Sequence, residues 1–135
     1  MGTQISPMLA VSDGTAAIEF YRNAFEAEEM WRLDAGGHVV ACLSVNGAEF
    51  FLADESPSYG TRSPNLAGYT TVRIELFVDD PYEVHNRAVD AGASEADSVK
   101  ERSYPLVGPR PIKRMLQSAV VDPYGHVWLI GKMLE

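Results

Sequence analysis

The chain has 135 residues, 46% of them apolar, which fits one domain with a hydrophobic core. Its formal net charge of −8 argues against a nucleic-acid partner, because phosphate binding needs a basic surface. The single cysteine excludes an internal disulfide. The sequence has no long apolar run, which predicts no membrane span. Together with the lack of a secretory leader, this indicates a cytoplasmic protein.

The first half of the chain predicts one strand, one helix and three further strands, over residues 5–11, 14–25, 28–34, 38–45 and 48–53. Asp13 suits the start of the helix, since its carboxylate can accept from the free N–H groups of the first turn. Asn46 and Gly47 predict a tight hairpin turn, because both tolerate a positive φ. The first half therefore reads β-α-β-β-β.

A connector rich in Pro, Ser and Gly follows over residues 54–68, and the pattern then restarts. A helix is predicted to begin at Asp80-Pro81, with the aspartate as its cap and the proline at its first position, and to end at Gly92. Strands are predicted on either side of it, over residues 69–78, 94–99, 115–121 and 126–131.

The two halves are an internal repeat. A shift of 67 residues places Leu9 and Asp13 on Leu76 and Asp80, and a shift of 78 places Phe51 on Leu129. The difference between the shifts predicts an insertion in the second half, around residues 100–114. We expect one domain over residues 1–135, with half-repeats over about 5–53 and 69–131.

Two tandem βαβββ units resemble the vicinal oxygen chelate superfamily, which includes glyoxalases, fosfomycin-resistance enzymes, extradiol dioxygenases and bleomycin-binding proteins. The resemblance lies in LAVSDGTAAIEFYRNAFEAEE at 9–29 and VVDPYGHVWLIG at 120–131, and LADESP at 52–57 is similar to the PhnB-like, bleomycin-resistance branch. Glu26 departs from the glycine usual in the family at this helix end. The resemblance implies an α+β fold of mixed sheets curled into a cup, with the helices on the outer face.

Metal enzymes of this superfamily hold their ion on the opening and closing strands of the halves. The resemblance carries those positions onto Ser6, Arg73, Phe51 and Leu129. Arginine is a permanent cation without an acceptor, and the Phe and Leu side chains offer no lone pair. We therefore expect no metal at the inherited positions and no cofactor.

Strand alternation assigns side chains to the cavity. Because the apolar side chains of 72–78 are expected to meet the helix, Arg73, Glu75 and Phe77 are predicted to line the cavity, and the other strands add Met8, Glu49, Phe51 and Leu129. Arg73 either binds an anionic or carbonyl group of a ligand or forms a structural ion pair with Glu75 or Glu49. Both interpretations stay open at this point.

Further candidates have two interpretations each. Trp31 and Tyr104 either stack on a flat ligand at the rim or form a dimer contact. His85 is expected at the surface, and so is His38. Cys42, Trp128 and His126 are expected to be structural. The insertion 100–114 carries five of the eleven basic residues and is either a lid for an anionic ligand or a solvated loop.

Two function classes remain. The first is a metal-independent protein that sequesters or carries a small organic molecule, anionic or aromatic, with no nucleic-acid or membrane partner. The second is an enzyme (a lyase, an isomerase or one of dioxygenase type) that uses Glu49 or Glu75, either alone or with a relocated metal for which Gln117 and His38 would be further ligands. Because pockets of this fold often form near a dimer interface, we also expect a homodimer.

Overall fold

The computed structural model describes residues 2–110 and 114–134. It divides the chain into two compact units, Met1–Tyr69 and Thr70–Glu135, which we call unit 1 and unit 2. Each unit holds one predicted half-repeat, so the α+β class and the tandem βαβββ arrangement are confirmed. That the two halves make up one domain stays a prediction.

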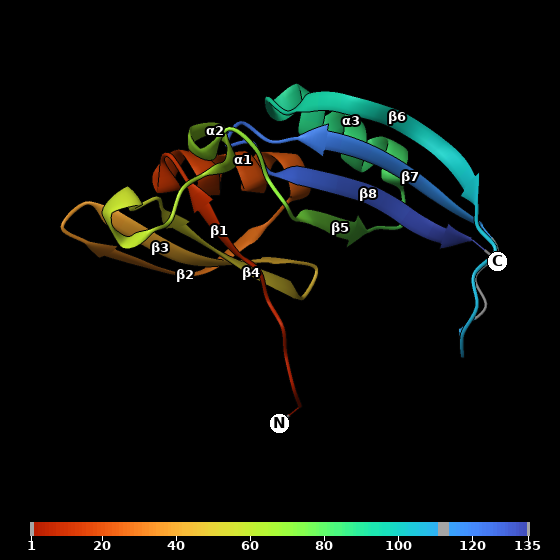
Figure 1. The fold of residues 1–135 in the computed structure, drawn as a ribbon, viewed down its shortest axis with the longest axis horizontal. Helices are drawn as coiled ribbons and strands as arrows, with labels where there is room; N and C mark the ends of the chain where they lie inside the picture. The colour runs from red at the N-terminus through yellow and green to blue at the C-terminus, as the bar shows by residue number, and fades with distance from the viewer. Residues whose placement is uncertain (1, 111–113, 135) are drawn as a thin grey trace. The chain divides into compact units, whose positions relative to one another are not determined.

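Unit 1 is a four-stranded mixed sheet with one long helix (Figure 1). The strand order is β1-β4-β3-β2, in which β1 and β4 run parallel and the other neighbours run antiparallel. Its elements are β1 (Met8–Val11), α1 (Gly14–Phe25), β2 (Glu28–Ala35), β3 (His38–Val45), β4 (Ala48–Asp54), the 3-10 turn η1 (Pro57–Tyr59) and the short helix α2 (Pro64–Ala67). The last two lie in the predicted connector.

Unit 2 repeats this topology, with the strand order β5-β8-β7-β6 and a parallel pair β5 and β8. Its elements are β5 (Arg73–Phe77), α3 (Pro81–Ala91), β6 (Ser94–Ser103), β7 (Arg114–Val121) and β8 (Val127–Leu134). The predicted strands at 5–11 and 69–78 are thus shorter in the structure, and Val72, expected to be packed, is exposed. None of the helices within the described residues is long and apolar enough to cross a membrane.

The strand register confirms the repeat residue by residue. In unit 1 Met8 pairs with Phe51, and in unit 2 Glu75 pairs with Leu129. The shifts of 67 and 78 that align the sequences carry the first pair onto the second. Because side chains alternate between the faces of a strand, equal register places equivalent residues on equivalent faces of the two sheets.

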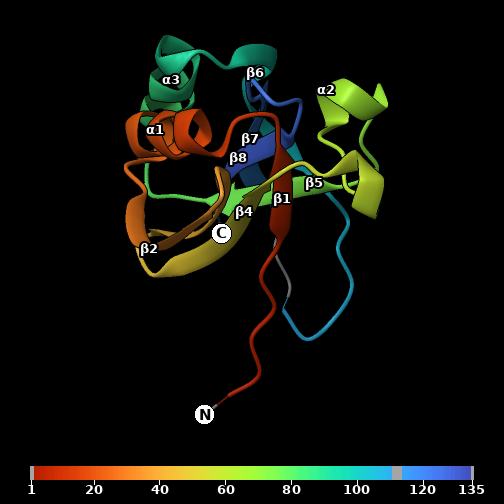
Figure 2. The ribbon, with the colours of Figure 1, turned by 90° about the vertical axis from the view of Figure 1, so that its left-hand side faces the viewer.

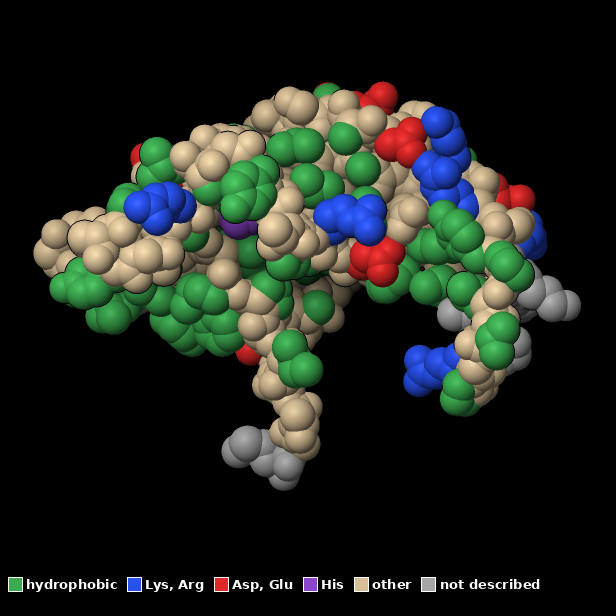
Figure 3. Space-filling view, in the orientation of Figure 1, with side chains coloured by type: hydrophobic (Ala, Val, Ile, Leu, Met, Phe, Trp, Pro, Cys, Tyr) green, Lys and Arg blue, Asp and Glu red, His purple; other side chains and the backbone are tan. Residues whose placement is uncertain are grey.

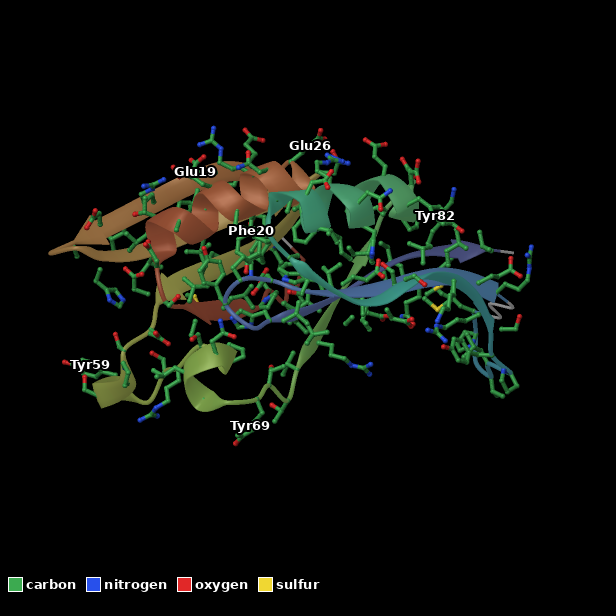
Figure 4. All side chains as sticks on the ribbon, turned by 90° about the horizontal axis from the view of Figure 1, so that it is seen from above. Glu19, Phe20, Glu26, Tyr59, Tyr69 and Tyr82 are labelled. Atoms are coloured by element: carbon green, nitrogen blue, oxygen red, sulfur yellow. The ribbon has the colours of Figure 1, made fainter. Side chains whose placement is uncertain are left out.

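Each helix covers one face of its own sheet (Figures 1 and 2). On α1, Ile18 and Tyr21 are fully buried, and Phe20 points towards the strands while Glu19 and Glu26 lie on the outer side (Figure 4). The Tyr21 ring contacts Phe50 of β4 edge-on, at 5.2 Å between centroids. The helix faces of the sheets therefore form the cores of the units, and the opposite faces are left for a binding site.

Both long helices begin at the predicted caps. Asp13 accepts from Ala16 N at 3.1 Å, and Asp80 accepts from Tyr82 N at 3.1 Å. The residue that follows the cap differs between the halves. In unit 1 it is Gly14, whose N–H donates to the Asp54 carboxylate at 2.6 Å. Its counterpart in unit 2 is Pro81, which has no N–H and so needs no such acceptor.

Among the described residues of unit 1, two other than glycine have a positive φ, at the positions that the sequence singled out. Asn46 has φ 51° in the β3–β4 turn, beside Gly47 with φ 90°. Glu26 has φ 56° at the end of α1, where the superfamily usually has glycine. The left-handed backbone conformation that favours glycine is thus present at this helix end with a glutamate in place of the glycine. A side chain in this conformation has a modest steric cost.

The turn before β8 is organised by one buried carboxylate. Asp122 accepts from Trp128 Nε1 at 2.9 Å, Tyr124 N at 2.9 Å and His126 N at 3.0 Å. Trp128 is 2% exposed, as expected of a core residue, and the main-chain bond to His126 gives this residue a structural role in the turn. The aspartate thereby fixes the start of the closing strand.

We predict that Asp122→Ala lowers the free energy of unfolding by about 3 kcal/mol or more, because it leaves several buried donors without an acceptor. Urea denaturation of the purified protein measures this loss. The matched control is Asp90→Ala on the exposed side of α3, which should change stability by less than about 0.5 kcal/mol. A loss below about 1 kcal/mol for Asp122→Ala would contradict this role.

Candidate functional site

A pocket of about 530 Å³ opens on unit 2, on the face of its sheet opposite α3. Its size is within the usual range for small-molecule sites. The lining residues come from β5, β7, β8 and the segments next to them, namely Thr71, Arg73, Glu75, Tyr104, Met115, Gln117 and Leu129. Figure 3 shows basic and acidic side chains over β5, next to apolar ones. The structure thus brings together Arg73, Glu75, Leu129 and Tyr104 of the predicted set.

The Glu75 carboxylate is held by an amide rather than by a cation. Gln117 Nε2 donates to Glu75 Oε1 at 2.8 Å. Gln117 lies on β7 and Glu75 on β5, with β8 between them, so the contact spans roughly 10 Å of sheet. On β8, Gly131 pairs with Gln117 and Leu129 pairs with Glu75, so the contact runs diagonally across this strand.

Within unit 2, Arg73 does not form the ion pair with Glu75 that was one alternative to ligand binding. It is exposed in the pocket wall, and within residues 2–110 and 114–134 no carboxylate pairs with it. The proposed pairing with Glu75 is therefore wrong for the described residues, and the hydrogen bond that Glu75 does accept comes from Gln117. Glu49, the other proposed partner, belongs to unit 1.

A second charged group lies on the same face of the sheet, on β6. The register pairs Lys100 with Gln117 and Arg102 with Met115, so both cations extend from the pocket side of the sheet. Asp97 accepts from Lys100 at 2.9 Å and also pairs with Arg102. The hydrogen bond from Lys100, together with the charges of both cations, holds the pKa of Asp97 below its ordinary value. The cluster carries one more positive than negative charge.

Apart from Phe77, the rest of the predicted set lies in unit 1, and three of its members lie in one row across the sheet. Met8 pairs with Phe51, Phe51 with Cys42 and Cys42 with Trp31, so these side chains share a face. The Trp31 and Phe51 rings lie 5.9 Å apart between centroids. The row itself is apolar, in contrast to the charged face of unit 2, and exposes nearly half of Trp31, while Glu49 lies on the same face outside the row.

Cys42 is buried in the middle of that row, as expected of a small core residue. Burial, and after it the neighbouring Glu49 carboxylate, raises the pKa of the thiol above its ordinary value. Both effects disfavour the thiolate, which is the reactive form. The cysteine is therefore not set up as a nucleophile.

Phe77 departs from the prediction, whereas Tyr104 of the basic insertion agrees with it. Phe77 is half exposed but does not line the pocket, because it lies beyond Glu75 towards the end of β5. The loop within the basic insertion has Tyr104 at the pocket and Val107 fully exposed. Lys113, one of the five basic residues assigned to this insertion, lies outside the described residues.

His85 was expected at the surface, and this is wrong. It is 3% exposed, and its Nδ1 lies 2.7 Å from Ser118 Oγ while its Nε2 lies 2.6 Å from Glu95 Oε2. The sequence carried a signal for this, since His85 lies on one helix face with Pro81 and Ala88, which are also buried.

The three groups have the composition of a Ser-His-Glu triad, but the arrangement does not suit nucleophilic catalysis. Ser118 is 1% exposed and points to α3, away from the pocket, so its hydroxyl cannot meet a substrate. A nucleophile needs access as well as an adjacent base. These residues instead link α3 to β6 and β7 through hydrogen bonds that run from buried Ser118 and His85 to the exposed Glu95.

The residues at the inherited metal positions do not fit a divalent ion. In unit 2 the pocket offers one carboxylate, Glu75, and it is already bonded to Gln117. Arg73 next to it would repel a cation, and Leu129 has no donor atom. Across the described residues, no group of three His, Cys, Asp or Glu side chains is placed to hold a metal. His38 and Glu49, the other proposed ligands, belong to unit 1.

The repeated βαβββ units and an open pocket on the sheet face away from the helix define a small α+β protein of the glyoxalase type of fold. The sequence profile of the Glyoxalase/Bleomycin resistance protein/Dioxygenase superfamily matches residues 4–130. The chain belongs to this superfamily.

Relatives and solved structures agree with this assignment. An uncharacterized protein of Mycobacterium bovis is 35% identical over 133 residues, covering 95% of this chain and 82% of the relative. The crystal structure of TioX from Micromonospora sp. ML1 has a TM-score of 0.70 at 22% identity, covering 98% of this chain and 100% of that chain. The fosfomycin resistance protein FosX of Listeria monocytogenes, complexed with Mn(II) and sulfate, has a TM-score of 0.64 at 14% identity, covering 98% and 93%. At these identities the two structures establish the shared fold.

We predict that Arg73→Met changes the free energy of unfolding by less than about 0.5 kcal/mol, because no described ion pair is lost. Chemical denaturation of both proteins checks this. A loss of about 3 kcal/mol that Glu75→Gln recovers is the result expected of a buried ion pair, and it would contradict the arrangement described above.

We predict that Cys42 in the folded protein reacts with a disulfide reagent at neutral pH about tenfold or more slowly than in the denatured chain, because burial and Glu49 disfavour the thiolate. Stopped-flow absorbance with an aromatic disulfide measures both rates. Glu49→Gln should increase the rate in the folded state, whereas Glu19→Gln on the exposed side of α1 should not. Equal rates for the folded and denatured chain would contradict the buried position.

Proposed function

We propose that this protein binds a small organic molecule in the pocket of unit 2, without a divalent metal, and sequesters or carries it. The observation that carries the proposal is the state of Arg73, a guanidinium in a pocket wall with no ion-pair partner among the described residues. A planar cation with five donors is suited to a carboxylate, a phosphate or a carbonyl group. The ligand is accordingly expected to carry an anionic or carbonyl group.

The remaining lining residues supply the other contacts of a small-molecule site. Leu129 and Met115 give apolar area, and Tyr104 offers an aromatic face at the rim, 44% exposed. The rest of the wall is polar, with Thr71, Glu75 and Gln117 beside Arg73, so polar contacts to the ligand outnumber apolar ones. Aromatic stacking at Tyr104 favours a ligand with a flat or apolar part.

Metal independence follows from the chemistry of the side chains at the inherited positions. FosX, which shares the fold, was crystallised with Mn(II), whereas here an arginine and two hydrocarbon side chains take three of those positions. Assignment to the PhnB-like, bleomycin-resistance branch and assembly as a homodimer belong to the same proposal and rest on the family resemblance. Analytical ultracentrifugation tests the dimer, and elemental analysis of the purified protein tests the metal.

A second candidate function is supported by the contact between Gln117 and Glu75. A carboxylate held at a pocket wall by a neutral amide keeps a free oxygen that can accept a proton from a substrate. On this alternative the protein is an enzyme that uses Glu75 as a general base. Turnover of a bound compound that is lost in Glu75→Gln, with binding retained, would establish it.

The binding proposal is tested by an unbiased ligand search with native mass spectrometry on the wild-type protein, followed by titration of each hit. We predict that Arg73→Met weakens the binding of an anionic hit by about tenfold or more, the scale of one charge-assisted hydrogen bond. Arg22→Met, on the exposed side of α1, is the matched control and should leave binding unchanged. Hits that bind equally well to wild type and Arg73→Met would refute this site.

A further inference from the structure

The pocket of unit 2 presents two opposite charges that do not neutralise each other. Arg73 and Glu75 are two residues apart on β5, so their side chains leave the same face of the sheet from Cα atoms roughly 7 Å apart. Glu75 accepts its hydrogen bond from Gln117, which is neutral, and over the described part of the chain neither charge has an ion-pair partner. Each charge is therefore available to a ligand.

Within the described residues, the unpaired charges of Arg73 and Glu75 contrast with the ion pairs found elsewhere in the molecule. Charged residues three or four apart on α1 and α3 pair with each other, as Arg22 does with Glu19 at 3.2 Å and Arg87 with Glu83 at 3.4 Å. On β6, Asp97 neutralises Lys100 on the same face of the sheet as the pocket. Within the pocket, the amide of Gln117 holds Glu75 in place, and the carboxylate is not drawn onto Arg73.

A ligand with only one charge satisfies one side of this pocket and meets repulsion from the other. An anion on Arg73 lies near the Glu75 carboxylate, and a cation on Glu75 lies near the Arg73 guanidinium. A molecule that carries both charges on neighbouring atoms contacts both residues favourably. Leu129, Met115 and Tyr104 supply an apolar surface for the rest of such a molecule.

We propose that the pocket of unit 2 recognises a zwitterion, a small molecule with an ammonium group and a carboxylate close together and an apolar or aromatic side group, such as an α-amino acid or a compound with such an end. Its carboxylate binds Arg73, and its ammonium group donates to the Glu75 oxygen that Gln117 leaves free. The inference rests on the proposed function and specifies the ligand class for the same site.

Three probes with one aromatic ring and the same two-carbon spacer test this: L-phenylalanine, which has both charges, 3-phenylpropionate, which has the carboxylate alone, and 2-phenylethylamine, which has the ammonium alone. Dissociation constants are measured by NMR titration of the labelled full-length protein. We expect L-phenylalanine to bind at least about tenfold more tightly than either of the others. The amine also controls for the general attraction of cations to a chain of net charge −8.

Two variants assign each charge to its residue. Glu75→Gln keeps the shape of the side chain and an oxygen for Gln117, and it should abolish the preference for L-phenylalanine over 3-phenylpropionate. Arg73→Met should abolish the preference over 2-phenylethylamine. The exposed pair on α1 provides the controls, because Glu19→Gln and Arg22→Met remove the same charges outside the pocket and should leave all three constants unchanged.

The outcomes separate the two proposals. If 3-phenylpropionate binds as tightly as L-phenylalanine and Arg73→Met weakens both, the zwitterion inference is overturned while the binding proposal stands. If none of the probes binds up to its solubility limit, the zwitterion inference is also overturned, and the unbiased ligand search decides the binding proposal by itself. If the probes bind but no constant changes in Arg73→Met, both proposals fail.

Discussion

In each half of this protein the opening strand pairs in parallel with the closing strand, and the remainder of the half depends on that register. The pair Met8 and Phe51 in unit 1 has its equivalent in Glu75 and Leu129 in unit 2. A slip by one residue would turn every side chain of the strand to the other face and bring charged groups under the helix. The hydrophobic faces packed on α1 and α3 therefore also determine which side chains point away from the helices.

The same scaffold carries different chemistry in its two halves. The free face of unit 1 is apolar along the row from Met8 to Trp31, whereas that of unit 2 carries Arg73, Glu75 and the charged cluster on β6. The residues of the free face can differ between the two units because the helix-facing residues maintain the fold, and the residues of the opposite face are not needed for that packing. The positions at which metal enzymes of the superfamily hold their ion could thus be changed to Arg and Leu in unit 2 while the backbone pairing was kept.

Buried and half-buried polar groups hold the parts of the fold that hydrophobic packing does not specify. Asp122 defines the turn into β8, Asp54 receives the N–H of Gly14 at the start of α1, and His85 joins α3 to the sheet of unit 2. Each group has partners at hydrogen-bond distance, so its burial does not leave an unsatisfied charge or dipole. His85, Ser118 and Glu95 resemble a catalytic triad in composition and distances. These two criteria are not enough to identify a nucleophile, because the serine hydroxyl must also be accessible to a substrate.

The sequence by itself determined the order of the elements, the repeat, the helix caps at Asp13 and Asp80 and the face of β5 that bears Arg73, because these features follow from local periodicity and from hydrogen bonding within a few residues. Tertiary structure decided the partners. Gln117 reaches Glu75 diagonally across β8, and within unit 2 the ion pair that spacing along the chain made plausible is not formed. Helical spacing places His85 on the same face of α3 as Pro81 and Ala88, but only the tertiary structure supplies its hydrogen-bond partners, Ser118 and Glu95.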